Sequence, residues 1–167
     1  VNIWHKFEKD QITLKEYAFG LPQGTLIYAG RSFSLKADEQ KLKPHAQRLF
    51  EKAEDYHNQG RYSQALTHYE EILRTNKNAH IACYKISELL LNYSDSAFTD
   101  TARVLDLYNS VLEKDPGHPL FRYKLGELLW AGGQYEEAFA QYQLAADISP
   151  MFPQPYLGLG RYYLRRE

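Results

Sequence analysis

The sequence predicts an all-α solenoid of helix–turn–helix repeats, preceded by a short N-terminal arm that is irregular or β-hairpin-like. In residues 119–152, apolar side chains recur at helical spacing along two short segments, and Gly132 and Gly133 separate these segments. The same order of aromatic and small residues returns in residues 46–79, which indicates a structural repeat. Each hairpin of this kind buries its apolar side only against its neighbours, so several must stack into one body.

Taken in order, the chain divides into five parts. Residues 1–45 do not follow the repeat pattern and are expected to be an arm or linker. Residues 46–79 form the first repeat, and residues 80–118 form the second, with extra residues in its turn. Residues 119–152 form the third repeat. Residues 153–167 match only the opening of a repeat, so we expect the first helix of a fourth repeat or a capping helix.

The arm contains two stretches rich in β-branched and aromatic residues, at positions 11–19 and 25–35, with a turn signal at positions 20–24. A short hairpin is one interpretation of this pattern. The alternative is an extended arm that lies on the first repeat and covers Leu49 and Tyr56. The many apolar residues of the arm favour the covering arm over a free tail.

In the second repeat, residues 92–100 take the place of a tight turn. Thr99 or Asp100 can cap the helix that follows, because both side chains accept hydrogen bonds from free backbone N–H groups. Lengthening a turn costs little free energy, so we interpret the insertion as tolerated. A glycosylation sequon begins at Asn92, and it matters only if the protein enters a secretory pathway that glycosylates.

The third repeat resembles the tetratricopeptide repeat over its whole length. It has the Leu-Gly pair, the Gly-x-Tyr turn, the small Ala, the aromatic residue and the closing Ala and Pro of that family. These residues are Leu125, Gly126, Leu128, Leu129, Gly133, Tyr135, Ala138, Phe139, Tyr142, Ala145, Ala146 and Pro150. Gly126 and Ala138 are expected where the two helices cross, because bulk there would hold the backbones apart.

The resemblance implies a superhelix whose concave groove is lined by the first helix of each repeat and binds a peptide segment of a partner protein. In register, those helices place an aromatic strip beside carboxylates and lysines. The candidate groove residues are Phe50, Glu54, Tyr84, Lys85, Glu88, Tyr123, Lys124, Glu127, Trp130 and Arg161. The other interpretation is that the aromatic residues pack between repeats, while the lysines and glutamates form surface pairs worth about 0–1 kcal/mol.

Some members of the family bind the acidic carboxy-terminal tail of chaperones through a clamp of lysine, arginine and asparagine residues. This sequence fits the clamp poorly, because Phe50 and Glu54 stand where the first repeat needs Lys and Asn. The later clamp places hold Lys85, Leu120 and Lys124. Glutamates in the groove would also repel a carboxylate, so binding of a chaperone tail is not expected.

We therefore expect a protein–protein interaction scaffold or adaptor. Two alternatives remain open: a regulatory or substrate-recruiting domain of a larger enzyme, such as a glycosyltransferase or hydroxylase, and an assembly factor of a bacterial envelope. The sequence begins with Val and shows no signal peptide at its start, which decides little, because a processed piece of a longer chain would look the same. The compartment therefore stays open: cytoplasmic or, if a signal was removed, periplasmic or luminal.

Several function classes are not expected from this sequence. The net charge of −1 disfavours a general nucleic-acid binder. His80 and Cys83 have metal-ligand spacing but no second pair beside them, and Cys83 fits better as a small buried residue. No catalytic or cofactor-binding fingerprint occurs, so we expect neither an enzyme nor a cofactor. No apolar run is long enough to insert into a membrane.

Overall fold

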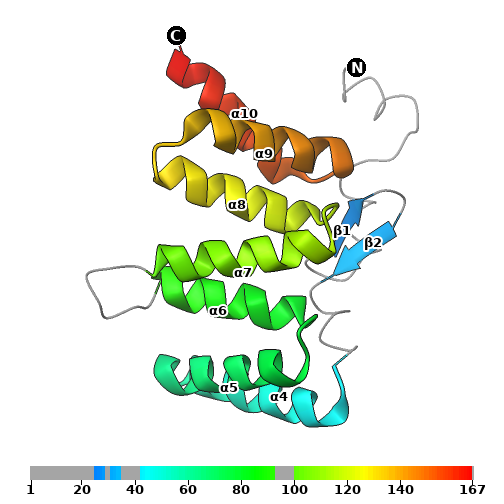
Figure 1. The fold of residues 1–167 in the computed structure, drawn as a ribbon, viewed down its shortest axis with the longest axis vertical. Coiled ribbons are helices and arrows are strands. Elements are labelled where there is room, and N and C mark those ends of the chain that lie inside the picture. Colours follow the sequence, from blue (N-terminus) through cyan, green and yellow to red (C-terminus); the bar gives the residue numbers. More distant parts are fainter. Residues whose placement is uncertain (1–24, 29–30, 35–41, 93–99, 167) are drawn as a thin grey trace.

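The computed structural model describes residues 25–28, 31–34, 42–92 and 100–166. Seven α-helices lie in this described part, and they stack in sequence order along the long axis of the molecule (Figure 1). Their bounds are α4 Pro44–Asn58, α5 Tyr62–Thr75, α6 His80–Asn92, α7 Thr101–Lys114, α8 Pro119–Ala131, α9 Tyr135–Ile148 and α10 Pro153–Arg166. The predicted all-α solenoid is confirmed. None of these helices combines the length and the apolar character needed to cross a membrane.

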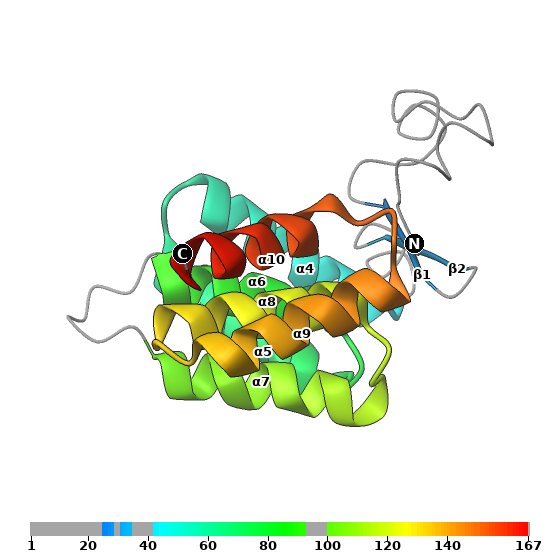
Figure 2. The ribbon, with the colours of Figure 1, turned by 90° about the horizontal axis from the view of Figure 1, so that it is seen from above.

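Consecutive helices pair into the hairpins α4–α5, α6–α7 and α8–α9, and α10 packs on both α9 and α8. Viewed from above, the first helices of the hairpins lie to one side and the second helices to the other (Figure 2). We call the surface formed by α4, α6, α8 and α10 the first-helix face. It carries the side chains that the sequence proposes for partner binding.

The turns inside the first and third hairpins share one geometry. Gly60 and Gly133 have φ angles of 73° and 80°, in the left-handed region that glycine adopts without strain. The residue after each glycine donates its backbone N–H to a carbonyl of the last helical turn, which satisfies an otherwise free acceptor. These bonds run from Arg61 N–H to Tyr56 O at 2.8 Å and from Gln134 N–H to Leu129 O at 2.9 Å.

Proline and a capping carboxylate fix where other helices begin. Pro44, Pro119 and Pro153 are the first residues of α4, α8 and α10, where the missing proline N–H would have had no helical partner. The Asp100 side chain accepts a hydrogen bond from the backbone N–H of Arg103 at 3.2 Å. Asp100 is therefore the cap of α7.

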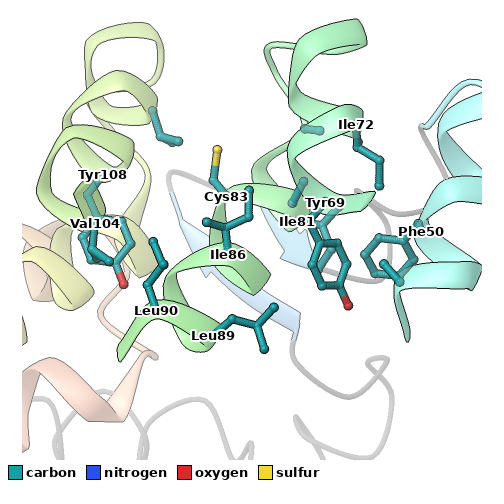
Figure 3. Packing of buried hydrophobic residues seen from close by; sticks show 14 of the residues in the cluster. Phe50, Tyr69, Ile72, Ile81, Cys83, Ile86, Leu89, Leu90, Val104 and Tyr108 are labelled. Carbon is teal, nitrogen blue, oxygen red and sulfur yellow. The ribbon is translucent and has the colours of Figure 1, made fainter. Parts of the chain in front are cut away.

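Buried aromatic and aliphatic side chains from successive helices form one continuous core (Figure 3). Tyr69, Tyr108 and Tyr142 occupy equivalent positions in α5, α7 and α9, and each is at most 2% exposed. Cys83 is buried in the same core, and burial raises the pKa of its thiol to about 11. The prediction of Cys83 as a small buried residue is confirmed, because a protonated thiol surrounded by apolar atoms packs as one.

The crossing of α8 and α9 is as close as the small residues predict. A Cβ atom added to Gly126 would stand 2.6 Å from the Tyr142 ring and 3.3 Å from the Ala138 carbonyl oxygen. Ala138 is fully buried. On the other side of the same ring, a Cβ atom added to Gly158 would stand 2.7 Å away. The Tyr142 ring is thus clamped between two glycines, one from α8 and one from α10.

The described part of the N-terminal arm forms a β-hairpin. Strands β1, Thr25–Tyr28, and β2, Arg31–Ser34, pair antiparallel, so both strands fall within the second of the two β-prone stretches. The first stretch and the turn signal at positions 20–24 lie outside the described residues. Strand β1 contacts α8 of the third hairpin, whereas we expected the arm to lie on the first repeat.

Candidate functional site

The candidate residues come from equivalent positions of the first helices, so they form rows across the first-helix face. Glu54, Glu88 and Glu127 hold one position in α4, α6 and α8, and Arg161 holds it in α10. The row therefore ends in a cation after three carboxylates. The geometry around each carboxylate decides whether it is available to a ligand.

Glu54 joins the first hairpin to the second. Its Oε1 atom accepts a hydrogen bond from the hydroxyl of Tyr69, the buried tyrosine of α5. The same oxygen lies 2.8 Å from the Nζ atom of Lys85 on α6. One carboxylate thus holds a second helix of its own hairpin and the first helix of the next hairpin.

Glu127 makes the same arrangement at the other end. Its Oε1 atom accepts hydrogen bonds from the Tyr142 hydroxyl and from Nη2 of Arg161, each at 2.5 Å. Arg161 also donates to the Tyr142 hydroxyl oxygen at 2.8 Å. Arg161 does not stand at the repeat position of Lys85. It nevertheless pairs with the equivalent carboxylate, at the junction between a hairpin and the first helix that follows it.

The middle carboxylate is satisfied differently. Glu88 accepts a hydrogen bond of 2.6 Å from the hydroxyl of Tyr84, one turn earlier on the same helix. The Nζ atom of Lys124 lies 5.2 Å from the centre of the Tyr84 ring, within range of a cation–π interaction. Surface pairs between the lysines and glutamates were one of the two interpretations of this face, with partners expected on the same helix. Lys85 instead reaches Glu54 of the preceding repeat.

The aromatic row is only partly a surface. Phe50 is 3% exposed and its ring centre lies 5.7 Å from that of Tyr69, so Phe50 belongs to the core and does not line the face as expected. Tyr123, its equivalent in α8, is partly exposed and contacts Phe152 edge-on at 5.5 Å. Tyr84 is also partly exposed. The accessible aromatic side chains of this row, Tyr84 and Tyr123, therefore lie on α6 and α8.

Trp130 extends this surface along α8 towards α10. The guanidinium carbon of Arg161 lies 4.4 Å from the centre of the Trp130 ring, and the Tyr135 ring meets the indole edge-on at 4.9 Å. Arg165 in turn stacks 3.8 Å over the Tyr135 ring. Trp130 remains partly exposed within this cluster, so its ring is held in place but open to a partner.

The phenols of the face stay protonated near neutral pH. Burial is the main cause that raises the pKa of Tyr84, and its bond to Glu88 adds to the rise. Burial and the charge of Glu127 raise the pKa of Tyr123, although Arg161 opposes this. These tyrosines therefore act as hydrogen-bond donors and as flat apolar surfaces.

Sequence reasoning missed the two buried tyrosines that anchor the carboxylates. A signal was present, because Tyr69 follows Glu54 by 15 residues and Tyr142 follows Glu127 by 15 residues. One spacing repeated in two hairpins indicates one contact made twice. In the second repeat the turn insertion breaks this spacing.

This arrangement suits the binding of a partner through the surfaces of the aromatic rings. It offers partly exposed rings beside carboxylates that already have donors, so a ligand would not need to neutralise them. Within the described ranges, no three His, Cys, Asp or Glu side chains gather closely enough to hold a metal ion.

Comparison with known proteins agrees with the hairpin geometry. Residues 97–151 match the family described as tetratricopeptide repeat. The chain is 29% identical, over 113 residues, to the Photosystem I assembly protein Ycf3 of Prochlorococcus marinus. That similarity covers 61% of this chain and 64% of the relative, so the chain spans less than two thirds of the relative's length.

Two solved structures share the fold at low sequence identity. The first tetratricopeptide domain of Spaghetti (RPAP3), bound to an HSP90 peptide, superposes with a TM-score of 0.61 at 16% identity, covering 72% of this chain and 92% of that one. MamA from Desulfovibrio magneticus RS-1 superposes with a TM-score of 0.59 at 23% identity, covering 79% and 72%. At these identities the likeness concerns the fold alone.

Proposed function

The chain belongs to the tetratricopeptide repeat proteins, and from this premise we propose that its first-helix face holds a segment of a partner protein. Proteins of this fold are protein–protein interaction scaffolds, and the proposal concerns where and how this one binds. The segment lies across α6 and α8, with Tyr84, Tyr123 and Trp130 as its main contacts.

One observation carries the proposal. Tyr84, Tyr123 and Trp130 remain partly exposed on adjacent helices, while the carboxylates between them are satisfied within the protein. Tyrosine and tryptophan dominate the energetics of protein interfaces, because each buries a large rigid surface and keeps a polar tip. A partner that covers these rings gains apolar contact without having to break an ion pair.

The chemistry of the partner follows from the same contacts. We expect a segment with apolar or aromatic anchors, and an affinity that depends weakly on salt, because the face carries paired charges of both signs. The RPAP3 structure contains a peptide of sequence SRMEEVD, which has an acidic end. Here Lys85 and Arg161 are already paired with glutamates, and Lys124 lies over the Tyr84 ring, so an acidic tail would have to compete with contacts that these cations already make.

A second candidate is a role as an assembly factor, in which the bound segment belongs to a subunit of a complex under construction. The similarity to the Photosystem I assembly protein Ycf3 favours it. The two candidates use the same face and differ in the fate of the partner, so one binding experiment serves both.

The test is a selection from a random peptide library on the whole chain, followed by titration of the selected peptides. We expect aromatic or large aliphatic anchors in them. Tyr84→Ala and Tyr123→Ala should each lose at least about 1 kcal/mol of binding. Leu144→Ala is the matched control, because Leu144 is 42% exposed but lies on α9.

The titrations are repeated at low and high salt. Unchanged affinity in both tyrosine variants would place the interface elsewhere on the molecule. A steep fall of affinity with salt would show that charge, and not the aromatic row, holds the partner. Circular-dichroism melts of each variant show whether the fold is intact.

A further inference from the structure

The three carboxylates in the row on the first-helix face do not have the same set of partners. Glu54 and Glu127 each hold one tyrosine hydroxyl and one cation of the first helix that follows. Glu88 also holds a hydroxyl, that of Tyr84 at 2.6 Å. Among the residues that the structure describes, however, Glu88 forms no ion pair. Glu88 therefore keeps the capacity to bind a cation.

The lysine that could pair with Glu88 is present but lies elsewhere. Lys124 holds in α8 the repeat position that Lys85 holds in α6. Lys85 lies 2.8 Å from Glu54, the carboxylate of the preceding hairpin. The Nζ atom of Lys124 lies instead 5.2 Å from the centre of the Tyr84 ring, and within the described ranges Lys124 makes no ion pair. Two equivalent lysines thus have different partners.

The tyrosine that bonds each carboxylate explains this difference. Tyr69 and Tyr142, which donate to the outer carboxylates, are fully buried, so no cation can lie on their rings from the groove. Tyr84 belongs to the first-helix face itself and is partly exposed. Its ring is therefore open to Lys124, whereas its hydroxyl is bonded to Glu88. Lys124 has two places to go, the ring and the carboxylate.

A bound partner would change the balance between these two places. Lys124, Tyr84 and Glu88 are all partly exposed, and a cation–π contact and an ion pair have similar small energies at such positions. A segment that covers α6 and α8 excludes water, which strengthens the attraction between opposite charges. The same segment competes for the Tyr84 ring. Both effects favour the ion pair over the cation–π contact.

We propose that Lys124 is a displaceable cover of Tyr84. When the partner segment binds, Lys124 leaves the ring and pairs with Glu88, and a neutral aromatic or aliphatic side chain of the partner takes its place on the ring. The new ion pair repeats the contact that Lys85 already makes with Glu54. This inference rests on the function proposed above, because it concerns the same face, and it adds the residue that selects the anchor of the partner.

The charges at this junction explain why the anchor is neutral. Lys124 stays beside the ring after it moves, so a basic side chain of the partner would meet a like charge there. An acidic side chain would meet Glu88 in the same way. Without Lys124, the Tyr84 ring and the Glu88 carboxylate together would attract a cation. Lys124 therefore excludes basic anchors from Tyr84.

The first experiment tests this selection with two peptides. One is a peptide selected on the whole chain, and the other is the same peptide with its anchor on Tyr84 changed to arginine. Lys124→Met keeps the length of the side chain and removes its charge, so it should shift the ratio of the two affinities towards the arginine peptide at least about fivefold. Lys85→Met is the matched control. It should not produce this shift, because Lys85 covers no ring.

The second experiment follows the lysine by NMR of its Cε methylene group. In the free chain the ring current of Tyr84 should displace the Lys124 signal, and Tyr84→Leu should abolish the displacement. Saturation with a selected peptide should move the signal, and Glu88→Gln should alter its position only in the saturated chain. The Lys85 signal should respond to Glu54→Gln in both states, because that ion pair is already formed. Thermal melts show that each variant is folded.

The outcomes separate this inference from the groove proposal. Peptides that bind Tyr84→Ala and Tyr123→Ala as tightly as the parent would refute the groove, and the inference with it. Peptides that need both tyrosines but leave the Lys124 signal in place at saturation would overturn the inference alone. An equal preference for the arginine peptide in the parent and in Lys124→Met would do the same.

Discussion

A pair of identical glycine substitutions tests the packing of the solenoid most directly. Gly126→Ala adds one methyl group at the crossing of α8 and α9, where it would stand 2.6 Å from the Tyr142 ring. Gly160→Ala adds the same methyl group at the equivalent position of α10, where no atom lies within 4 Å. The chemistry of the two changes is the same, so only the surroundings differ.

The expected free energies have opposite signs. Replacing a glycine inside a helix by alanine stabilises by roughly 0.5–1 kcal/mol, because the unfolded chain loses freedom. At Gly126 this gain is outweighed by overpacking, which costs about 1–3 kcal/mol. The ring of Tyr142 cannot move aside, because Gly158 lies against its other edge and the hydroxyl is bonded to Glu127.

Both variants are compared with the parent by thermal and urea unfolding. In a chain of this size, 1 kcal/mol corresponds to about 2–4 °C in the midpoint temperature. We expect Gly126→Ala to melt below the parent and Gly160→Ala to melt at or above it. A Gly126→Ala variant as stable as the parent, or a Gly160→Ala variant destabilised as much as Gly126→Ala, would contradict this close crossing.

Three further predictions concern single side chains. Burial, with His80 adding to the effect, lowers the pKa of His118 to about 3, so only the unfolded state gains this proton as pH falls below about 6.5. The stability that neutral His118 provides is therefore lost between pH 6.5 and about 3, and His118→Gln should flatten the slope of unfolding free energy against pH in that window. Cys83 should react with a thiol-specific reagent only as fast as the chain opens, since its pKa is raised to about 11, and equally fast labelling in native and denaturing buffer would contradict this. Glu127→Gln keeps an acceptor for Tyr142 and should cost less than about 1 kcal/mol, because the ion pair with Arg161 is partly exposed. Glu127→Ala leaves the Tyr142 hydroxyl without its acceptor and should cost about 1–3 kcal/mol in urea unfolding, so equal losses would show that the hydroxyl bond contributes little.

The sequence predicted the parts of the fold that depend on local spacing. The helix pattern, the glycine turns and the close crossing of Gly126 and Ala138 all follow from residues near each other in the chain. The β-prone composition of the arm predicted a hairpin, but composition marks a strand without marking its partner. The predicted pairing used positions 20–24 as the turn, whereas both strands lie in residues 25–34.

The candidate site was predictable as a row of residues but not as a set of contacts. Helical periodicity placed Lys85 beside Glu88, yet the shape of the solenoid brings Lys85 to Glu54 of the preceding repeat. Helical periodicity also predicted that Phe50 and Tyr123 both line the first-helix face, although Phe50 is buried against Tyr69. Which member of a row is exposed depends on neighbours that lie far away in sequence.

The carboxylate contacts have a mechanical consequence for the array. Glu54 and Glu127 each bond a tyrosine of their own hairpin and a cation on the first helix that follows that hairpin, α6 or α10. A rotation of that following helix against the hairpin would therefore strain both bonds together. Between the second and third hairpins, Lys124 of α8 lies over the ring of Tyr84 of α6. This cation–π contact has no strict geometry, so it tolerates sliding of one helix past the other. The superhelix should therefore bend between α6 and α8, and its curvature there can adapt to the width of whatever lies across the two tyrosines.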